Sequence, residues 1–262
     1  MDIWIKPRKP ACRSVSPCLT RVSKQTKATM AAQQQVVWVD GASGSGKTSL
    51  AQALHEQGWI SFEGDAFFTG ADPLDNGCDP SARNGTEQVK QWTKDMSAYF
   101  FALWGGRVPD ADLKERVAVG YDAMCSAVLE VCQTKPENNI VISRAVYSND
   151  LRARITERLG PHLKWVCLTA TNEWLGARIE SRFVEQGAGL GKTLEEFIGM
   201  WPAEMFPDGE DRVAYLRRSW WWSSMTSFDP PLNASMISIH VDDSVSKDDV
   251  KGKALAFLGI AS

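Results

Sequence analysis

The feature that most constrains this chain is a glycine-rich motif that follows a short apolar run. Residues 41–48 read GASGSGKT and match the pattern G-x-x-x-x-G-K-[ST], and the run VVWVD at residues 36–40 comes directly before them. The glycines let the backbone curl so that several N–H groups point at one phosphate, while the lysine adds a mobile positive charge and the threonine a hydroxyl suited to Mg²⁺. We expect a strand, a phosphate-binding loop (the P-loop) and a helix that begins at about Gly46, with its positive end toward the phosphates.

The residues expected to contact the phosphates run from the first glycine of the motif to the start of this helix. Lys47 is expected to stabilise the β- and γ-phosphates, and Thr48 to bind Mg²⁺. The full set is Gly41, Ala42, Ser43, Gly44, Ser45, Gly46, Lys47, Thr48 and Ser49. A Gly/Ser turn that merely carries a lysine is disfavoured, because a strand pattern precedes the motif and a helical pattern follows it.

Length and charge limit the classes of protein to consider. With 262 residues, 44% of them apolar, the chain can form one large nucleotide-binding domain with insertions. The net charge of −3 is uneven, because residues 1–35 carry seven basic groups and one acidic group, whereas the remainder carries 22 basic and 31 acidic groups. An acidic body argues against a nucleic-acid partner, since binding to a phosphate backbone needs a basic face.

Residues 1–35 have the composition of a leader. They combine basic residues with serines, threonines and three prolines, and they contain no sustained apolar run. This is typical of a disordered segment or an organelle transit peptide, and it argues against a secretory signal. Translation could also begin at Met30, in which case residues 1–29 would have no targeting role. We expect a cytoplasmic protein, with the mitochondrion or a plastid as the alternative. The folded domain is expected to span residues 36–262.

The six cysteines show no C-x-x-C or His-bracketed spacing, which favours buried free thiols in a reducing compartment over a metal cage. Cys125 and Cys132 are seven residues apart in a helical pattern and are expected on one buried face, while Cys167 falls inside an apolar run. Because no apolar run approaches the roughly 18 residues of a membrane span, no membrane partner is expected. Oligomeric state is left open, with a homodimer as one option.

Five short apolar runs alternate with segments of helical period. The expected strands are residues 36–40, 59–63, 140–143, 164–169 and 236–241, and the expected helices are residues 49–57, 87–104, 112–132, 151–159, 172–185, 194–200 and 247–258. This alternation predicts an α/β fold, a three-layer sandwich in which a five-stranded parallel sheet has helices on both faces. Two long helices between the second and third strands indicate an insert at about residues 66–135, the usual place for a cover over a second substrate.

Tryptophans gather in the segment 201–235, which has no clean period. Trp201, Trp220, Trp221 and Trp222 lie there among proline, aspartate and serine. They would suit an aromatic platform for a ligand, but rings that fill the gap beside an irregular insertion are the favoured interpretation.

The second strand leads into Glu63-Gly64-Asp65. Ligands of open α/β sheets bind beyond the carboxyl ends of the strands, so Asp65 is expected in the same crevice as the P-loop. Its carboxylate can accept the proton of an acceptor hydroxyl or hold Mg²⁺ through water. A helix N-cap is the alternative role for Asp65. Glu63 is expected to support or orient a ligand.

The third strand is followed by the stretch RAVYSNDLR at residues 144–152. Arg144 leaves the strand end at the crevice, where a guanidinium can bind an anionic acceptor as a fork. Tyr147 could donate to a substrate oxygen or pack as a ring. Arg152 falls within a helical pattern and is expected to be a solvated or ion-paired surface group.

After the fourth strand, Arg178 and Arg182 share one helical face just before the glycine-rich stretch at residues 187–192. Arginines on a closing segment stabilise the charge that spreads over the oxygens during phosphoryl transfer, so residues 178–193 are a candidate lid, to which Lys192 could belong. The alternative is a surface pair bridged to Glu180 or Glu185, followed by an ordinary helix end.

Together these residues resemble the small-molecule kinases of the P-loop NTPase superfamily, most closely the gluconate kinase-like group. The resemblance rests on the P-loop, the strand that leads into Gly64-Asp65, the segment 145–152 with its final Asp-Leu-Arg, and the two lid-like arginines. It implies ATP- and Mg²⁺-dependent phosphorylation of a hydroxyl group. The stretch after Asp65 lacks the histidine and the later Asp-Asp-Arg loop of that group, so we expect a diverged acceptor pocket.

Three functions follow as hypotheses. The leading one is an ATP-dependent kinase for a small hydroxylated metabolite, for which a sugar acid is one option. The second is a nucleoside or nucleotide kinase, in which Arg144 and Arg83 would engage the acceptor. The third is a non-catalytic nucleotide-binding switch, although the Asn-Lys-x-Asp motif of a GTPase is absent.

Overall fold

A five-stranded parallel sheet forms the centre of the molecule. The computed structural model describes residues 34–74, 86–104, 108–201, 203, 206, 208–217 and 235–260. The strands are β1 (Val36–Gly41), β2 (Ile60–Glu63), β3 (Ile140–Ser143), β4 (Leu163–Thr169) and β5 (Met236–His240). They pair in the order β2-β3-β1-β4-β5, every neighbour parallel. The predicted α/β fold and all five predicted strands are confirmed, and each strand end lies within one residue of its expected position.

All seven predicted helices are present among the described residues, together with two short helices that were not predicted. The helices are α1 (Lys47–His55), α2 (Gly64–Thr69), α3 (Glu87–Trp104), α4 (Ala111–Thr134), α5 (Asn149–Leu159), α6 (Asn172–Gly189), α7 (Leu194–Gly199), α8 (Arg212–Tyr215) and α10 (Lys247–Leu258). The unpredicted ones are α2 and α8, which are too short to show a period. Helix α6 continues four residues beyond the expected end at residue 185.

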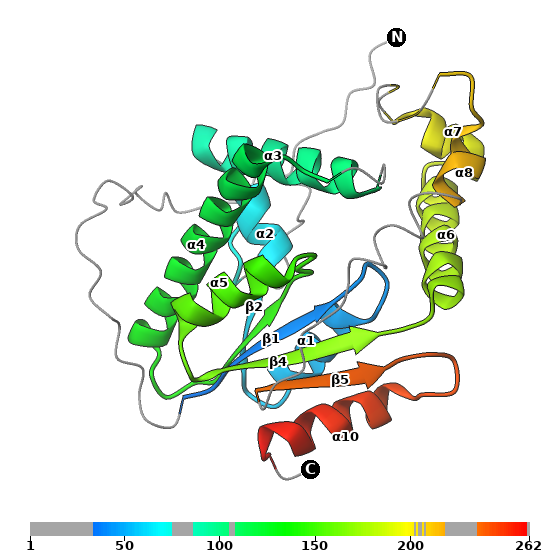
Figure 1. Ribbon diagram of the computed structural model, residues 1–262. Coiled ribbons are helices and arrows are strands. Elements are labelled where there is room, and N and C mark those ends of the chain that lie inside the picture. Colours follow the sequence, from blue (N-terminus) through cyan, green and yellow to red (C-terminus); the bar gives the residue numbers. More distant parts are fainter. Residues whose placement is uncertain are drawn as a thin grey trace, which may run out of the picture.

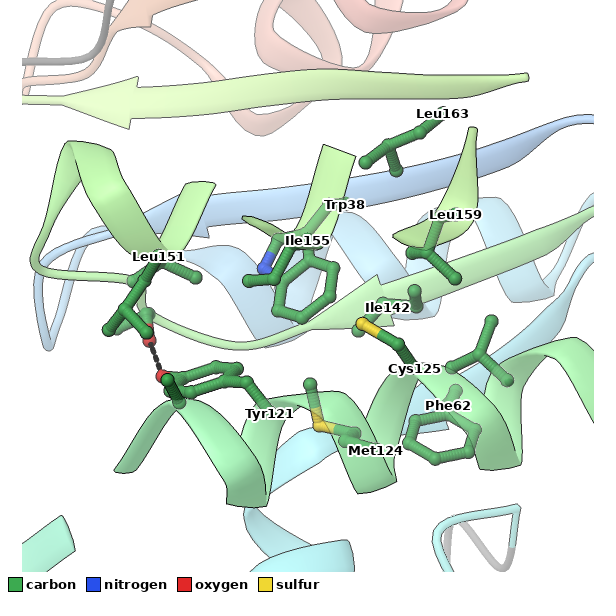
Figure 2. Packing of buried hydrophobic residues seen from close by; sticks show 14 of the residues in the cluster. Trp38, Phe62, Tyr121, Met124, Cys125, Ile142, Leu151, Ile155, Leu159 and Leu163 are labelled. Atoms are coloured by element: carbon green, nitrogen blue, oxygen red, sulfur yellow. Dashed lines mark hydrogen bonds between the residues drawn. The ribbon is translucent and has the colours of Figure 1, made fainter. Parts of the chain in front are cut away.

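The alternation of side chains along the strands divides the core into two layers. Val36 and Trp38 of β1 point to the face covered by α4 and α5, while Val37 and Val39 point to the face covered by α1 and α10. Figure 1 shows these helices on opposite sides of the sheet. Figure 2 shows the first layer, in which Trp38 lies between the sheet and residues of α4 and α5. Helices therefore cover both faces, as predicted.

The predicted insert forms a packed wall beside β2 and β3. Gly120 of α4 allows close approach, because a Cβ there would lie 3.0 Å from Phe68 of α2 and 3.5 Å from Trp92 of α3. The Tyr121 hydroxyl donates to the Ala145 carbonyl at 2.8 Å, which joins α4 to the loop after β3. Figure 1 shows α2, α3 and α4 together on this side of the sheet. The insert is thus joined to the strand ends near the P-loop.

A third apolar cluster joins α6, α7 and α8 to the P-loop. Its buried members are Ala42, Leu175, Ile179, Ile198, Phe206, Val213 and Leu216. Trp201 packs its ring against Phe183 at 5.4 Å and Phe197 at 6.2 Å between centroids, which agrees with the packing interpretation of this tryptophan. Trp220, Trp221 and Trp222 lie outside the described residues.

Three cysteines are buried free thiols, as predicted: Cys125 and Cys132 share a face of α4, and Cys167 lies in β4. Cys12, Cys18 and Cys78 lie outside the described residues. No helix in the described part of the chain is both long and apolar enough to span a membrane.

Candidate active site

The loop at residues 41–46 curls between β1 and α1 through three glycines with positive φ. These are Gly41 at 148°, Gly44 at 82° and Gly46 at 97°, and the last is the N-cap of α1. A Cβ on Gly41 would lie 2.6 Å from the Leu168 carbonyl oxygen of β4, so a side chain does not fit there. The backbone path that the motif predicts is therefore present, and α1 begins at Lys47, one residue after the expected start.

The donors of the loop suit a phosphate group. The Ser45 hydroxyl is buried and has no hydrogen-bond partner in the described part of the chain, so it is free to serve a bound ligand. The Lys47 ammonium donates to the Ala42 carbonyl at 2.9 Å and so lies back over the loop. Thr48 and Ser49 are exposed in the first turn of α1. These residues fit a nucleotide phosphate, and the Thr48 hydroxyl fits its Mg²⁺.

Charged groups from four elements surround the Lys47 ammonium. Burial lowers the pKa of Lys47 to about 8; Asp40 and Glu63 act to raise it, and Arg144 and Arg182 to lower it. These groups come from the ends of β1 and β2, the residue after β3, and helix α6. The site is therefore built at the carboxyl ends of the strands, where parallel sheets bind ligands.

Asp65 and Arg144, which the sequence predicts as separate site residues, form an ion pair. Asp65 lies in the first turn of α2, and its carboxylate Oδ1 pairs with Nη1 of Arg144. The Asp65 side chain is 65% exposed and that of Arg144 only 8%. Asp65 is not the N-cap: Glu63 caps α2 by accepting from the Asp65 backbone N–H at 3.4 Å.

Aromatic rings surround the Arg144 guanidinium. Its central carbon lies 4.8 Å from the ring centroid of Phe68 and 5.9 Å from that of Phe100. Tyr147 packs edge-on against Phe100 at 5.0 Å, and burial raises the pKa of Tyr147 to about 12. The packed ring agrees with the second of the two roles considered for Tyr147, while donation to a substrate oxygen remains a prediction.

Arg152 is not the surface group that its helical position predicted, because it is buried. Its side chain is 1% exposed, and its Nε donates to Asp40 Oδ2 at 2.8 Å. Asp40 also accepts from the backbone N–H groups of Gly41 at 2.7 Å and Val146 at 2.8 Å. Burial raises the pKa of Asp40, and Arg152 opposes that shift. The pair fastens the start of the P-loop to the segment after β3.

Sequence reasoning did not include Asp40 among the functional residues, although a signal was available. A carboxylate that ends the apolar run VVWVD is buried once that run is a central strand, and a buried carboxylate needs a positive partner. That partner is 112 residues further along the chain, so the pairing itself could not be deduced from spacing.

The two arginines of α6 lie on the P-loop side of the helix, but they differ in their contacts. Arg178 donates to the Gly44 carbonyl at 3.3 Å, and its guanidinium stacks 4.6 Å from the Trp174 ring centroid. Arg182 is exposed, and its charge acts on Lys47. The alternative of a pair bridged to Glu180 or Glu185 is not supported, because Glu180 pairs with Arg217 and Glu185 accepts from Ser181.

The segment predicted as a lid contains ordered secondary structure. Helix α6 runs through Gly187 and ends at Gly189, and Gly191, at φ +67°, forms the turn before Thr193 caps α7. Lys192 is half-buried in this turn. Arg83 lies outside the described residues.

A cavity of about 590 Å³ adjoins the P-loop, and Arg144 is not among the residues that line it. It is lined by Gly44, Ser45 and Gly46, by Trp174 and Arg178 of α6, and by the loop between β5 and α10 from Val241 to Lys247. The Trp174 indole N–H donates to Asp243 at 2.8 Å and so joins α6 to that loop. The cavity offers an aromatic ring, a guanidinium and carboxylates beside the phosphate loop.

Comparison with known proteins shows distant likenesses only. No family model matches the chain, and no curated protein matches it. Among solved structures, a gluconokinase from Sinorhizobium meliloti is similar at 18% sequence identity, with a TM-score of 0.48. The match covers 86% of this chain and 91% of the gluconokinase chain. A sugar kinase from a Janibacter species has 17% identity, coverage of 87% and 96%, and a TM-score of 0.48. The tunicamycin resistance protein of Deinococcus radiodurans has 15% identity, coverage of 87% and 98%, and a TM-score of 0.39.

Proposed function

We propose that this protein is an ATP-dependent phosphotransferase that moves the γ-phosphoryl group of ATP to a hydroxyl group of a small metabolite. The observation that carries the proposal is that charged groups of β1, β2, the residue after β3 and α6 act on Lys47 within a phosphate-binding loop, and that Asp65 pairs with one of them, Arg144. A site that only held phosphate would not need a carboxylate beside these cations, whereas phosphoryl transfer needs a proton acceptor as well as positive charge.

The donor nucleotide has a place for each of its parts. The 590 Å³ cavity takes the base against Trp174 and Arg178, and the P-loop takes the phosphates. Lys47 and Arg182 bring positive charge to the oxygens of the transferred group. The Thr48 hydroxyl, and Asp65 through water, would hold Mg²⁺, which would neutralise further phosphate charge when bound.

The acceptor hydroxyl is proposed to lie beside Asp65. The Asp65 carboxylate takes the hydroxyl proton, the acceptor oxygen forms a bond to the γ-phosphorus, and the bond from that phosphorus to the β-phosphate bridging oxygen breaks. The products are a phosphate ester, ADP and the proton held by Asp65, which passes to solvent from this exposed side chain. The described helices of the predicted insert, α2, α3 and α4, would limit the access of water to the bound acceptor.

The test is ADP formation by the purified full chain with a panel of sugar acids, polyols, nucleosides and nucleotides. One class of acceptor should be phosphorylated, and Asp65→Asn should lower kcat by about a hundredfold or more while leaving ATP affinity within threefold. Asp72→Asn, which removes an exposed carboxylate from the turn after α2, is the matched control and should keep its activity. ATP binding without transfer to any acceptor would favour the nucleotide-binding switch instead.

Glu63 provides a second check on the assignment of the base. It is half-buried, burial raises its pKa, and Arg144 and Lys47 act against that rise. Because Glu63 is proposed to be a supporting group that caps α2, the substitution Glu63→Gln should lower kcat by less than about tenfold. A larger loss than in Asp65→Asn would transfer the role of base to Glu63.

A nucleoside or nucleotide kinase is the second candidate, favoured by the partly buried ring of Phe100 beside Arg144, which could stack on a base. In that case AMP, CMP or a nucleoside should be phosphorylated and should protect the insert from proteolysis. Sugar acids should then have no effect.

A further inference from the structure

Arg144 is a buried cation whose partner is exposed, which is an unusual arrangement for an ion pair. The buried guanidinium needs a negative group, because an unpaired charge away from water is costly. The exposed Asp65 carboxylate has no such need, since water can solvate it. The ion pair therefore stabilises the buried Arg144, whereas the exposed Asp65 can leave the pair at little cost.

One edge of the guanidinium is left without a partner. Asp65 engages Nη1, while Nε is buried and makes no hydrogen bond to the described residues. Phe68 and Phe100 lie against the guanidinium, and rings offer no acceptor in its plane. Guanidinium donors lie in a fixed plane and match the two oxygens of a carboxylate or phosphate, so an anion that bound with both oxygens would also satisfy Nε, which Asp65 leaves unpaired, and would compete with Asp65.

The backbone is shaped to hold Arg144 in this position. A Cβ on Gly64 would lie 2.8 Å from the Arg144 Cβ and 3.0 Å from its Cδ, so the absence of a side chain at Gly64 lets the arginine lie against the start of α2. Asp65 is the next residue and can turn away about its own side-chain bonds without moving that backbone. The buried partner is thus fixed, and the exposed partner is free to move.

We propose that Asp65 occupies the anion site of Arg144 in the free protein, and that a carboxylate or phosphate group of the acceptor displaces it. This inference deepens the proposed function and rests on it for calling the anion an acceptor. A neutral sugar or nucleoside would leave Asp65 on Arg144, with the carboxylate engaged. An anionic hydroxylated metabolite would bind Arg144 and release Asp65 to take the hydroxyl proton, so binding of the correct class of acceptor completes the site.

The experiment measures sulfate binding to the full chain saturated with a non-hydrolysable ATP analogue and Mg²⁺, so that the P-loop, including its γ-phosphate position, is already filled. Calorimetry on Asp65→Asn should show sulfate binding at least tenfold tighter than in the unaltered protein, because the internal competitor is gone. Asp72→Asn removes the same charge from the adjacent turn without touching Arg144, and its affinity should change by less than twofold. Arg144→Gln should weaken binding at least tenfold.

Arg144→Lys covers the case in which Arg144→Gln fails to fold. It keeps the positive charge without the planar fork and should bind sulfate at least fivefold more weakly than the unaltered protein. Two results would overturn the inference: sulfate binding in Asp65→Asn no tighter than in Asp72→Asn, or binding unaffected by either change at Arg144.

This binding measurement requires no turnover, so it separates the two proposals. If sulfate displaces Asp65 in a protein that phosphorylates no acceptor, the proposed anion site at Arg144 is supported and the proposed kinase function is rejected. If the protein phosphorylates an acceptor but sulfate does not displace Asp65, the kinase function is supported and the anion site is rejected.

Discussion

At the scale of single residues, Lys47 shows how the fold sets the chemistry of a side chain. A lysine in water keeps its proton far above neutral pH, but burial lowers the pKa of Lys47 to about 8. In the free protein the ammonium is therefore charged below pH 8 and becomes neutral as the pH rises through that value. A bound triphosphate requires the charged form, because its oxygens are negative.

Nucleotide affinity should consequently fall with pH over a range in which ordinary lysines stay charged. Between pH 7 and pH 9 the affinity for ATP should drop about tenfold, as expected one pH unit above a pKa of about 8. Fluorescence or calorimetric titration over this range provides the measurement.

Lys47→Arg supplies the control for this prediction, because arginine stays charged throughout the range. Its ATP affinity should be weaker overall but nearly independent of pH. An unaltered protein whose affinity stays constant to pH 9 would show that Lys47 keeps its proton in the free protein.

At the scale of elements, the Asp40–Arg152 pair joins three parts of the chain. Arg152 lies in α5 and Asp40 is the last but one residue of the central strand β1. Arg152 Nη2 also donates to the Val146 carbonyl in the segment between β3 and α5. Loss of one member would leave the other charged and buried, which is far more costly than loss of an exposed pair.

Arg152→Met should therefore lower the free energy of unfolding by about 3–5 kcal/mol, as measured by urea denaturation. The matched control is Arg158→Met on the same helix, where a partly exposed arginine pairs with Asp122 at 3.4 Å. That change should cost less than about 1 kcal/mol. Equal effects in the two variants would mean that Asp40 does not depend on Arg152.

The elements also show what the sequence could and could not predict. The strands and long helices were foreseen because each has a clear period. Helix α2 was missed because its six residues begin with glycine, a poor helix former, and hold too few turns for a period. Helix α6 extends through Gly187, where a Cβ would lie 3.1 Å from the Lys192 carbonyl. Packing against the following turn, rather than local preference, sets the end of that helix.

For the site, as for the helices, features with a local sequence signal could be predicted and those set by tertiary packing could not. The P-loop could be placed because its chemistry lies within eight consecutive residues. The partners of Arg144 and Arg152 could not, because each ion pair joins strand ends that meet only in the folded sheet. Burial of Arg152 in particular depends on the packing of α5 against the sheet, which its polar sequence neighbours do not reveal.

At the scale of the whole molecule, the core layer between the sheet and helices α4 and α5 should keep Cys125, Cys132 and Cys167 unreactive. Burial raises the pKa of Cys125 and Cys167 to about 12 and that of Cys132 to about 11, so the reactive thiolate is scarce at neutral pH.

A variant with serine at positions 12, 18 and 78 should therefore show no thiol that reacts rapidly with an aromatic disulfide reagent at pH 8. After unfolding in guanidinium, all three remaining thiols should react. Rapid reaction of any of them in the folded state would show that its part of the core opens readily.

The strand order has a consequence for how the chain is made. The central strand β1 pairs with β3 and β4 and not with β2, so Gln35 beside it meets Asn139 only after 104 further residues have been added. At a synthesis rate of about 5–20 residues per second, the run VVWVD waits roughly 5–20 s for its first partner strand. During that interval a strand whose six residues are all buried in the folded protein, with the phosphate loop attached, lacks its partner strands. It is therefore a segment that protection by a chaperone would help.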